Sequence, residues 1–177
     1  SDNPIIVGPL FVFWFVGIVN AVNLIDGMDG LAGGYIFLTS FFALIIGWIT
    51  GNKDFIYFNT IFMGAMAAFL YFNQRPAKFF MGDSGSLLLG FHLAVLPLLY
   101  FATMPSKQII NMTPFIILSS YLIIDTTRVF YDRLKKRMHP LEPDQNHLHH
   151  LLYNSTGSYK GTLLTIFIYL SIFGVMA

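Results

Sequence analysis

Long apolar stretches alternate with short polar breaks along almost the whole of this chain. Six stretches approach the ~20 apolar residues that a helix needs to cross ~30 Å of hydrocarbon. They cover roughly 5–25, 31–50, 55–72, 85–102, 109–130 and 161–177. The breaks between them carry glycine, proline, asparagine or charged residues, which favour turns. The pattern predicts an all-α integral membrane protein, a bundle of about six transmembrane helices, and we expect residues 1–177 to form a single membrane domain.

Composition strengthens this interpretation. Hydrophobic residues make up 55% of the 177 residues and charged residues 11%, whereas about 25% of the residues of a soluble domain are charged. The net charge of +1 indicates no nucleic-acid partner. The chain has no cysteine, so disulfides and thiolate metal sites are excluded.

The basic residues predict how the chain is oriented in the bilayer. If the six spans alternate, one side of the membrane holds most of the Lys and Arg, namely Arg75, Lys78, Arg128, Arg133, Lys135, Lys136, Arg137 and Lys160. The other side holds Lys53 and Lys107. Because positively charged loops face the cytoplasm, the first side is predicted to be cytoplasmic. Most acidic residues fall on that side too, so one face should hold nearly all the chemistry.

Polar side chains at the end of the first stretch form a first constellation, NAVNLIDGMDGLAGG (residues 20–34). Asn20, Asn23, Asp26 and Asp29 recur every three residues, and on a helix they would follow one slowly turning face. Amides and carboxylates at the edge of a bilayer are costly unless they meet protein, water or ligand. A polar turn at a helix end would need fewer of them, so we expect a binding surface here.

A second constellation, FNQRPAKFFMGDSGSLLLG (residues 72–90), leads into the fourth stretch. Asp83 lies among glycines and serines at a predicted helix start, where it could simply cap the helix. A carboxylate there can also bind Mg²⁺, which often takes one or two protein carboxylates and completes its shell with water and phosphate. Arg75 and Lys78 could attract phosphates or serve as ordinary cytoplasmic anchors.

A histidine cluster forms the third constellation, PDQNHLHHLL (residues 143–152). Asp144 could cap a short helix here, with His147 and His150 on one face and His149 a little around it. Three histidines suggest zinc, but no fourth ligand is evident and the other constellations are rich in oxygen ligands, which fit Mg²⁺ and phosphate better. Histidines can donate hydrogen bonds to phosphate or exchange protons near neutral pH. We therefore expect a functional role for the cluster.

Two further polar sites have structural explanations. His92 lies inside a predicted span and should hydrogen-bond to a neighbouring helix. Asp125 and Arg128, at i and i+3, should form an ion pair near the cytoplasmic edge.

Together, the three constellations resemble the motifs of the polyprenyl-phosphate N-acetylhexosamine-1-phosphate transferases, glycosyltransferase family 4. The first resembles the segment Asn-x-x-Asn-x-x-Asp-Gly-x-Asp-Gly-Leu-Ala, and the second resembles Pro-Ala-x-x-Phe-Met-Gly-Asp-x-Gly-Ser. The third resembles the His-x-His-His loop of the branch that uses UDP-N-acetylglucosamine, whereas the branch that makes the peptidoglycan precursor usually shows His-His-His. The likeness runs in order from about residue 10 to 160.

The chain departs from the family in two respects. The family carries a paired aspartate on an earlier cytoplasmic loop, and no adjacent aspartates occur here. Family members also have about ten spans. We therefore expect the chain to be the C-terminal part of a larger transferase, inactive by itself.

The resemblance implies roles for several residues around one polar pocket. The catalytic carboxylates would be Asp26, Asp29 and Asp83, and Asp83 would also be the metal ligand. The residues that hold the substrate would be Asn20, Asn23, Asn73, Phe80, His147, His149 and His150. Phe80 would stack on uracil, Asn73 and Asp26 would help hold the nucleotide, and the histidines would grip the diphosphate or the sugar.

The activity implied is transfer of N-acetylhexosamine 1-phosphate, most simply N-acetylglucosamine 1-phosphate, from a UDP-sugar to undecaprenyl phosphate with release of UMP. This is a first membrane step of cell-envelope polysaccharide synthesis, such as that of lipopolysaccharide. The cofactor would be Mg²⁺, with Mn²⁺ as a substitute, and the location the bacterial cytoplasmic membrane. The sequence leaves open whether the protein is a homodimer.

Other interpretations remain at this stage. Within the family, the chain could belong to a phospho-MurNAc-pentapeptide transferase. Outside it, a transporter or ion channel would also carry intramembrane polar residues, although those here cluster at one edge. A catalytically inactive membrane scaffold is the third alternative.

Overall fold

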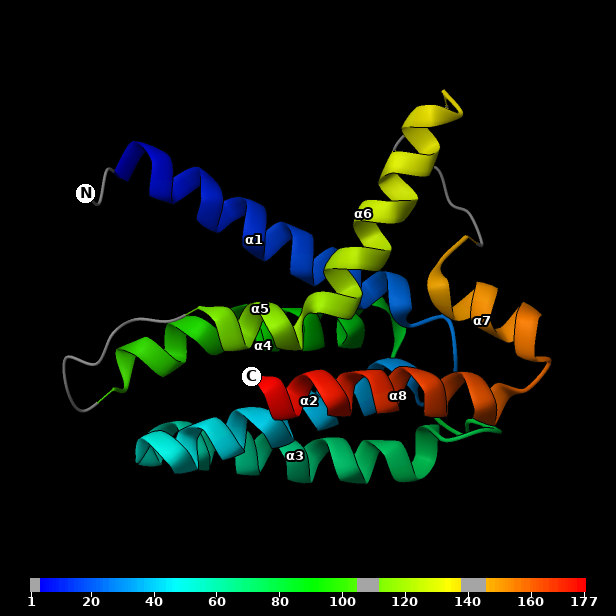
Figure 1. Ribbon diagram of the computed structural model, residues 1–177. Helices are drawn as coiled ribbons and strands as arrows, with labels where there is room; N and C mark the ends of the chain where they lie inside the picture. The colour runs from blue at the N-terminus through cyan, green and yellow to red at the C-terminus, as the bar shows by residue number, and fades with distance from the viewer. Residues whose placement is uncertain (1–3, 105–111, 138–145) are drawn as a thin grey trace.

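The computed structural model describes residues 4–104, 112–137 and 146–177, and all the regular structure in these ranges is helical (Figure 1). In chain order the helices are α1 (Pro4–Ile25), α2 (Leu31–Thr50), α3 (Lys53–Asn73), α4 (Gly82–Ala102), α5 (Thr113–Leu118), α6 (Ser120–Lys135), α7 (Leu148–Thr156) and α8 (Tyr159–Met176). The predicted all-α architecture is confirmed.

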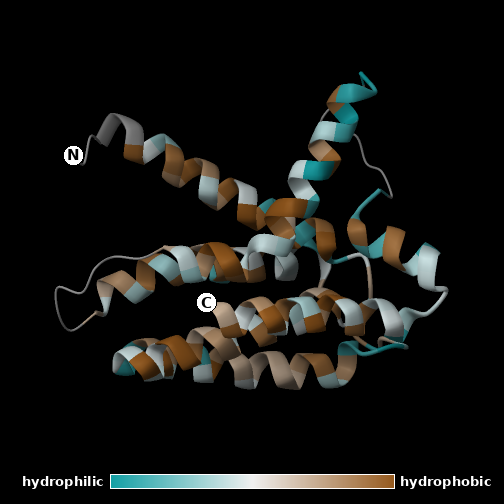
Figure 2. Cartoon of the chain, in the orientation of Figure 1, coloured by the Kyte–Doolittle hydropathy of each residue, from teal (hydrophilic) through white to brown (hydrophobic). Residues whose placement is uncertain are grey.

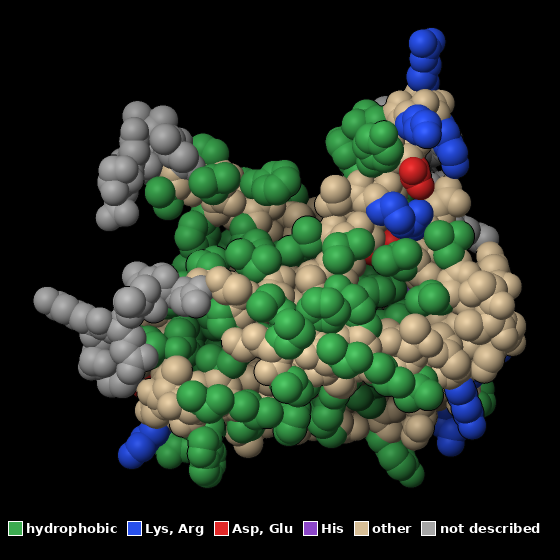
Figure 3. All heavy atoms as spheres, in the orientation of Figure 1, with side chains coloured by type: hydrophobic (Ala, Val, Ile, Leu, Met, Phe, Trp, Pro, Cys, Tyr) green, Lys and Arg blue, Asp and Glu red, His purple; other side chains and the backbone are tan. Residues whose placement is uncertain are grey.

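Five helices in the described ranges are long and apolar enough to cross a membrane. They are Val7–Ile25 of α1, Leu31–Thr50, Lys53–Asn73, Gly82–Ala102 and Tyr159–Met176. Hydrophobic residues predominate along these helices, while a hydrophilic stretch lies toward the C-terminal end of α6 (Figure 2). Hydrophobic side chains cover much of the face that Figure 3 shows, and large side chains such as Phe13, Trp48 and Ile61 are exposed. The chain is therefore a multi-pass membrane protein.

The predicted fifth span, 109–130, differs from the structure. Its described part is divided between α5, of 6 residues, and α6, of 16 residues, and neither reaches the length of a span. The Tyr35 hydroxyl of α2 donates to the Leu118 carbonyl oxygen at 2.6 Å, at the joint between the two helices. A side chain inserted into the helical hydrogen-bond ladder is a recognised cause of a kink. Beyond the joint, α6 rises steeply away from α5 (Figure 1).

Helix α2 lies at the centre of the bundle and packs against α1, α3, α4 and α8. Its side chains Tyr35 and Ile36 are fully buried. Helix α3 starts directly after α2, where the Asn52 side chain caps it by accepting a hydrogen bond from the Phe55 N–H at 3.1 Å. This packing brings the end of α1, the start of α2, the end of α3 and the start of α4 to the same end of the bundle.

Candidate functional site

A polar cavity of about 360 Å³ opens where these helix ends meet. Its lining residues come from two of the three constellations: Asn23, Asp26, Gly27, Met28, Asp29, Asn73, Phe80, Met81, Gly82 and Asp83. The predicted convergence of these two segments is therefore observed. Whether each side chain has the role that we expect for it stays a prediction.

The buried amide of Asn73 joins the two segments. Its Oδ1 accepts a hydrogen bond from the Gly30 N–H at 2.9 Å, and its Nδ2 donates to the Phe79 carbonyl oxygen at 2.9 Å. Gly30 has a φ of 76°, a left-handed conformation that a residue without a Cβ adopts at little cost. Asn73 thus holds the turn of residues 26–30, which carries Asp26 and Asp29 and is called the acidic turn below, against the segment that leads to Asp83.

Asp29 is tied on both sides of that turn. Its Oδ2 accepts from the Ala77 N–H at 3.2 Å, and its backbone carbonyl accepts from the Tyr159 hydroxyl at the start of α8 at 2.7 Å. The Arg75 guanidinium lies over the Tyr159 ring, 4.1 Å from its centroid. These contacts give Asp29 a fixed place in the wall of the cavity.

Asp83 is the second residue of α4 and is exposed. Met81, and not Asp83, occupies the N-cap position of α4, so the helix-cap alternative for Asp83 is not observed. The Asn23 amide lies 3.5 Å from Asp83 Oδ1 and donates more closely, at 2.8 Å, to Ser86 Oγ. The Asp83 carboxylate therefore keeps most of its acceptor capacity for a ligand.

Negative charge gathers in this cavity. Burial, together with the neighbouring carboxylates of Asp83 and Asp29, raises the pKa of Asp26 to about 6. None of the described residues that line the cavity is basic. A bound proton or cation would therefore reduce the repulsion between the carboxylates. The described residues hold no group of three Asp, Glu, His or Cys close enough to enclose a metal ion. One or two carboxylates with water and phosphate would suit Mg²⁺.

The histidine cluster lies beside the acidic turn. Helix α7 begins at Leu148, with His147 at its N-cap position, and Asp144, our expected cap, lies outside the described residues. The rings of His149 and His150 have centroids 4.2 Å apart. A Cβ built on Gly27 would lie 2.9 Å from His149 Nε2 and 3.5 Å from His150 Nε2. Thus His149 and His150 face the turn together.

His149 is fully buried, and neither ring nitrogen has a hydrogen-bond partner within the described part of the chain. Burial, aided by the neighbouring His150, lowers the pKa of His149 to about 4. Near neutral pH the ring is therefore uncharged, with one nitrogen able to donate and the other to accept. A buried side chain whose polar atoms lack partners, packed against Gly27 of the cavity lining, is suited to contact a polar ligand once that turn moves or binds one.

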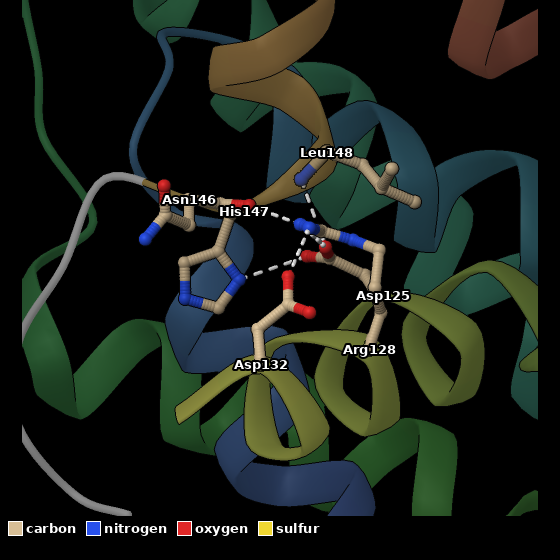
Figure 4. Close-up of polar contacts among 6 residues, drawn as sticks. All are labelled: Asp125, Arg128, Asp132, Asn146, His147 and Leu148. Carbon is tan, nitrogen blue, oxygen red and sulfur yellow. Dashed lines mark hydrogen bonds and ion pairs between the residues drawn. The ribbon is translucent and has the colours of Figure 1, made fainter. Parts of the chain in front are cut away.

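Helix α6 holds the start of α7 (Figure 4). The predicted pair of Asp125 and Arg128 is confirmed, with Arg128 Nη2 3.3 Å from Asp125 Oδ1. The same carboxylate accepts from His147 Nδ1 at 2.9 Å and from the Leu148 N–H at 2.8 Å, and Arg128 donates to the Asn146 carbonyl oxygen. The sequence predicts only the pair with Arg128, because the i, i+3 spacing is the one local signal, whereas the contacts with His147 and Leu148 join segments far apart in the chain.

The remaining sequence-based expectations have different outcomes. Phe80 lines the cavity with 71% of its surface exposed, which leaves a ring face open. Asn20 does not line the cavity, and its amide donates to the Val16 carbonyl oxygen at 2.8 Å. His92 lies 3.0 Å from Ser40 Oγ on α2, which confirms the expected bond to a neighbouring helix.

Comparison with known proteins identifies the relatives of this fold. The model of the family described as "Glycosyl transferase family 4" matches residues 2–101. A "Probable undecaprenyl-phosphate N-acetylglucosaminyl 1-phosphate transferase" of Bacillus subtilis is 35% identical over 170 residues, which cover 96% of this chain and 47% of the relative. An "Undecaprenyl-phosphate alpha-N-acetylglucosaminyl 1-phosphate transferase" of Thermotoga maritima is 34% identical over 156 residues, 88% of this chain and 46% of the relative.

A second kind of relative matches over a similar length. A "Phospho-N-acetylmuramoyl-pentapeptide-transferase" of Clostridium perfringens is 34% identical over 148 residues, 84% of this chain and 45% of the relative. The chain thus spans about half the length of the curated relatives that it matches.

Proposed function

This chain belongs to glycosyl transferase family 4, and we propose that the protein it forms transfers N-acetylglucosamine 1-phosphate from UDP-N-acetylglucosamine to undecaprenyl phosphate. The observation that carries the proposal is the acidic cavity at one end of a bundle of membrane helices. A membrane-embedded acceptor and a water-soluble anionic donor can meet at such a place. The names of the Bacillus subtilis and Thermotoga maritima relatives supply the class of reaction.

The reaction exchanges one phosphorus–oxygen bond for another. An anionic oxygen of the lipid phosphate attacks the β-phosphorus of the UDP-sugar, the bond between that phosphorus and the bridging oxygen breaks, and UMP leaves with the electron pair. The acceptor is already an anion, so the step needs no strong general base. Its main requirements are positioning and relief of the charge repulsion between phosphates.

The carboxylates meet the second requirement through a divalent cation. Asp83 and Asp26 would hold Mg²⁺, or Mn²⁺ in its place, because their negative charge is uncompensated in the cavity. The cation would neutralise charge on the diphosphate during the transfer. Asp29, whose side chain is bound to the Ala77 N–H, would add negative potential from a fixed position.

Neutral groups would hold the donor. The exposed Phe80 ring offers a stacking surface for uracil, and the Asn23 amide, at the cavity wall, offers polar contacts. His149 and His150 lie against Gly27, on the flank of the same cavity, and would donate hydrogen bonds to the diphosphate or the sugar. In this proposal His149 acts as a neutral donor, as its lowered pKa requires.

A second candidate function differs in the donor. The name of the Clostridium perfringens relative favours a phospho-N-acetylmuramoyl-pentapeptide transferase. Both candidates use the same phosphoryl chemistry and would differ in the groups that contact the sugar.

Release of UMP by the full-length protein in lipid nanodiscs tests the proposal. We expect UMP from UDP-N-acetylglucosamine only when undecaprenyl phosphate and Mg²⁺ are both present. UMP release with the muramoyl-pentapeptide donor alone would favour the second candidate. Absence of UMP with either donor would contradict both.

A further inference from the structure

The carboxylate of Asp125 connects two helices that are separated along the chain. Asp125 is 1% exposed and lies on α6. Its Oδ2 faces His147 Nδ1 at 2.9 Å, and its Oδ1 accepts from the Leu148 N–H at 2.8 Å. Figure 4 shows the ring and the backbone N–H approaching this carboxylate from the start of α7.

The chemistry of the carboxylate decides the state of the His147 ring. An ionised carboxylate can only accept hydrogen bonds, so His147 Nδ1 must carry the proton in this contact. In the neutral ring, Nε2 is then left as an acceptor, and in the charged ring it becomes a donor. A carboxylate that fixes the tautomer and orientation of a histidine in this way is common behind functional histidines.

Pairing with Arg128 would not by itself require these contacts. Arg128 reaches Asp125 from one turn away on the same helix, at 3.3 Å, and also reaches Asp132 Oδ2 at 3.3 Å. Beyond this pairing within α6, Asp125 and Arg128 also bind three groups at the start of α7, namely the Asn146 carbonyl, the His147 ring and the Leu148 N–H. Three consecutive residues are thus bound to one patch of α6.

The position of His147 at the start of α7 also sets the position of His149 next to the acidic turn. The His147 and His149 rings are nearly parallel, with centroids 5.9 Å apart. The His149 ring in turn packs against Gly27. Fixing the start of α7 therefore fixes the distance of His149 from the cavity wall.

We propose that Asp125 is a positioning residue for the donor site: it orients His147 and anchors the start of α7, and so holds the histidines against the acidic turn. This inference rests on the proposed function for its kinetic consequence. Its structural consequence, a His147 ring protonated at Nδ1, does not depend on the activity.

A double-mutant cycle in the full-length protein tests the kinetic part. We expect Asp125→Asn to raise the KM for UDP-N-acetylglucosamine by about 10-fold to 100-fold, with a smaller change in kcat. In the His147→Gln background the same substitution should have much less effect, because residues that act through one contact are not additive. Additive effects of Asp125→Asn and His147→Gln would overturn the inference.

Asp132→Asn is the matched control. Asp132 is paired with the same guanidinium of Arg128, is 40% exposed, and has no contact with α7 among the described interactions. Its substitution should leave the donor KM close to that of the wild type. An equal rise in KM would assign the effect to the Arg128 charge network and overturn the role of Asp125.

Nitrogen-15 spectra of labelled histidine test the structural part directly, on the His147 ring of the wild-type protein. The His147 signal, assigned by its loss in His147→Gln, should show protonation at Nδ1. A neutral ring protonated at Nε2 would overturn the inference even in a protein that releases UMP. Conversely, the expected signal in a protein that releases no UMP would leave the Asp125 contact standing and reject the proposed function.

Discussion

At the scale of single residues, the three carboxylates of the cavity differ in what already holds them. Asp29 is bound to the Ala77 N–H, whereas within the described ranges the Asp83 side chain has only a long contact, with the Asn23 amide. A carboxylate with free acceptor capacity at a cavity without basic lining residues is the best placed to bind a cation. Asp83 is therefore the side chain whose loss should affect cation binding most.

We predict that Asp83→Asn in the full-length protein lowers Mg²⁺-dependent UMP release by about 100-fold or more. Asparagine keeps the shape of the side chain and removes the charge that binds the cation. The measurement is UMP release over a range of Mg²⁺ concentrations. Asp54→Asn, at the start of α3 and the other end of the bundle, should behave as the wild type. Near-normal turnover by Asp83→Asn at ordinary Mg²⁺ would remove Asp83 from the metal site.

The raised pKa of Asp26 predicts that the free energy of unfolding depends on pH. Its pKa is raised from 3.8 to about 6, so the folded protein binds this proton more tightly than the unfolded chain. The stability that protonation contributes is present below pH 3.8 and is lost as the pH rises through about 6. Without divalent cations, Asp26→Asn should therefore raise the unfolding temperature at pH 7.5, and its advantage should shrink toward pH 4.5. An equal advantage at every pH would contradict the assigned repulsion.

At the scale of helices, the joint between α5 and α6 determines where Asp125 lies. The Tyr35 hydroxyl donates a hydrogen bond to the Leu118 carbonyl oxygen at this joint. We predict that Tyr35→Phe destabilises the protein by about 1 to 3 kcal/mol, because a buried carbonyl loses its partner. Thermal unfolding in detergent measures the change. Tyr57→Phe, at a ring that is 63% exposed on α3, is the control, and equal stability of both variants would dismiss the role of the hydroxyl.

The contact between the acidic turn and α7 depends on the missing side chain of Gly27. A Cβ there would lie 2.9 Å from His149 Nε2, and His149 is fully buried, so the ring has little room to move. We predict that Gly27→Ala displaces α7 and lowers UMP release by about 10-fold to 100-fold. Gly64→Ala, where a Cβ meets nothing within 4 Å, should be neutral. Full activity of Gly27→Ala would show that α7 is not needed at this distance.

At the scale of the whole molecule, the acidic turn, the cavity and α7 lie at one end of the bundle. The asymmetry of Lys and Arg predicts that this end faces the cytoplasm. The chain has no cysteine, so single introduced cysteines report one position each. Cysteines at Ser84 and Asn154 should react with an impermeant reagent only from the cytoplasmic side, and a cysteine at Thr50 only from the other. Labelling at Thr50 from the cytoplasmic side would reject this orientation.

The amino-acid sequence by itself determined the class of protein, most helices and the common end of the bundle at which the first two constellations lie. These features follow from local patterns: apolar runs long enough to span a bilayer, and polar motifs placed where those runs end. Span ends on one side of a membrane must lie at similar depth, so the segments of Asp26 and Asp83 could be placed at the same end of the bundle, and the family resemblance implied that they share one pocket.

Tertiary structure alone decided the rest. Where the predicted fifth span divides, the Leu118 carbonyl oxygen accepts from Tyr35, which is 83 residues away in the chain. Which histidines face the acidic turn depends on how α7 packs, and the second role of Asp125 depends on His147, 22 residues away. Such contacts leave no periodic trace in the sequence, because they are set by the angles at which helices cross and by which buried polar atoms find partners there.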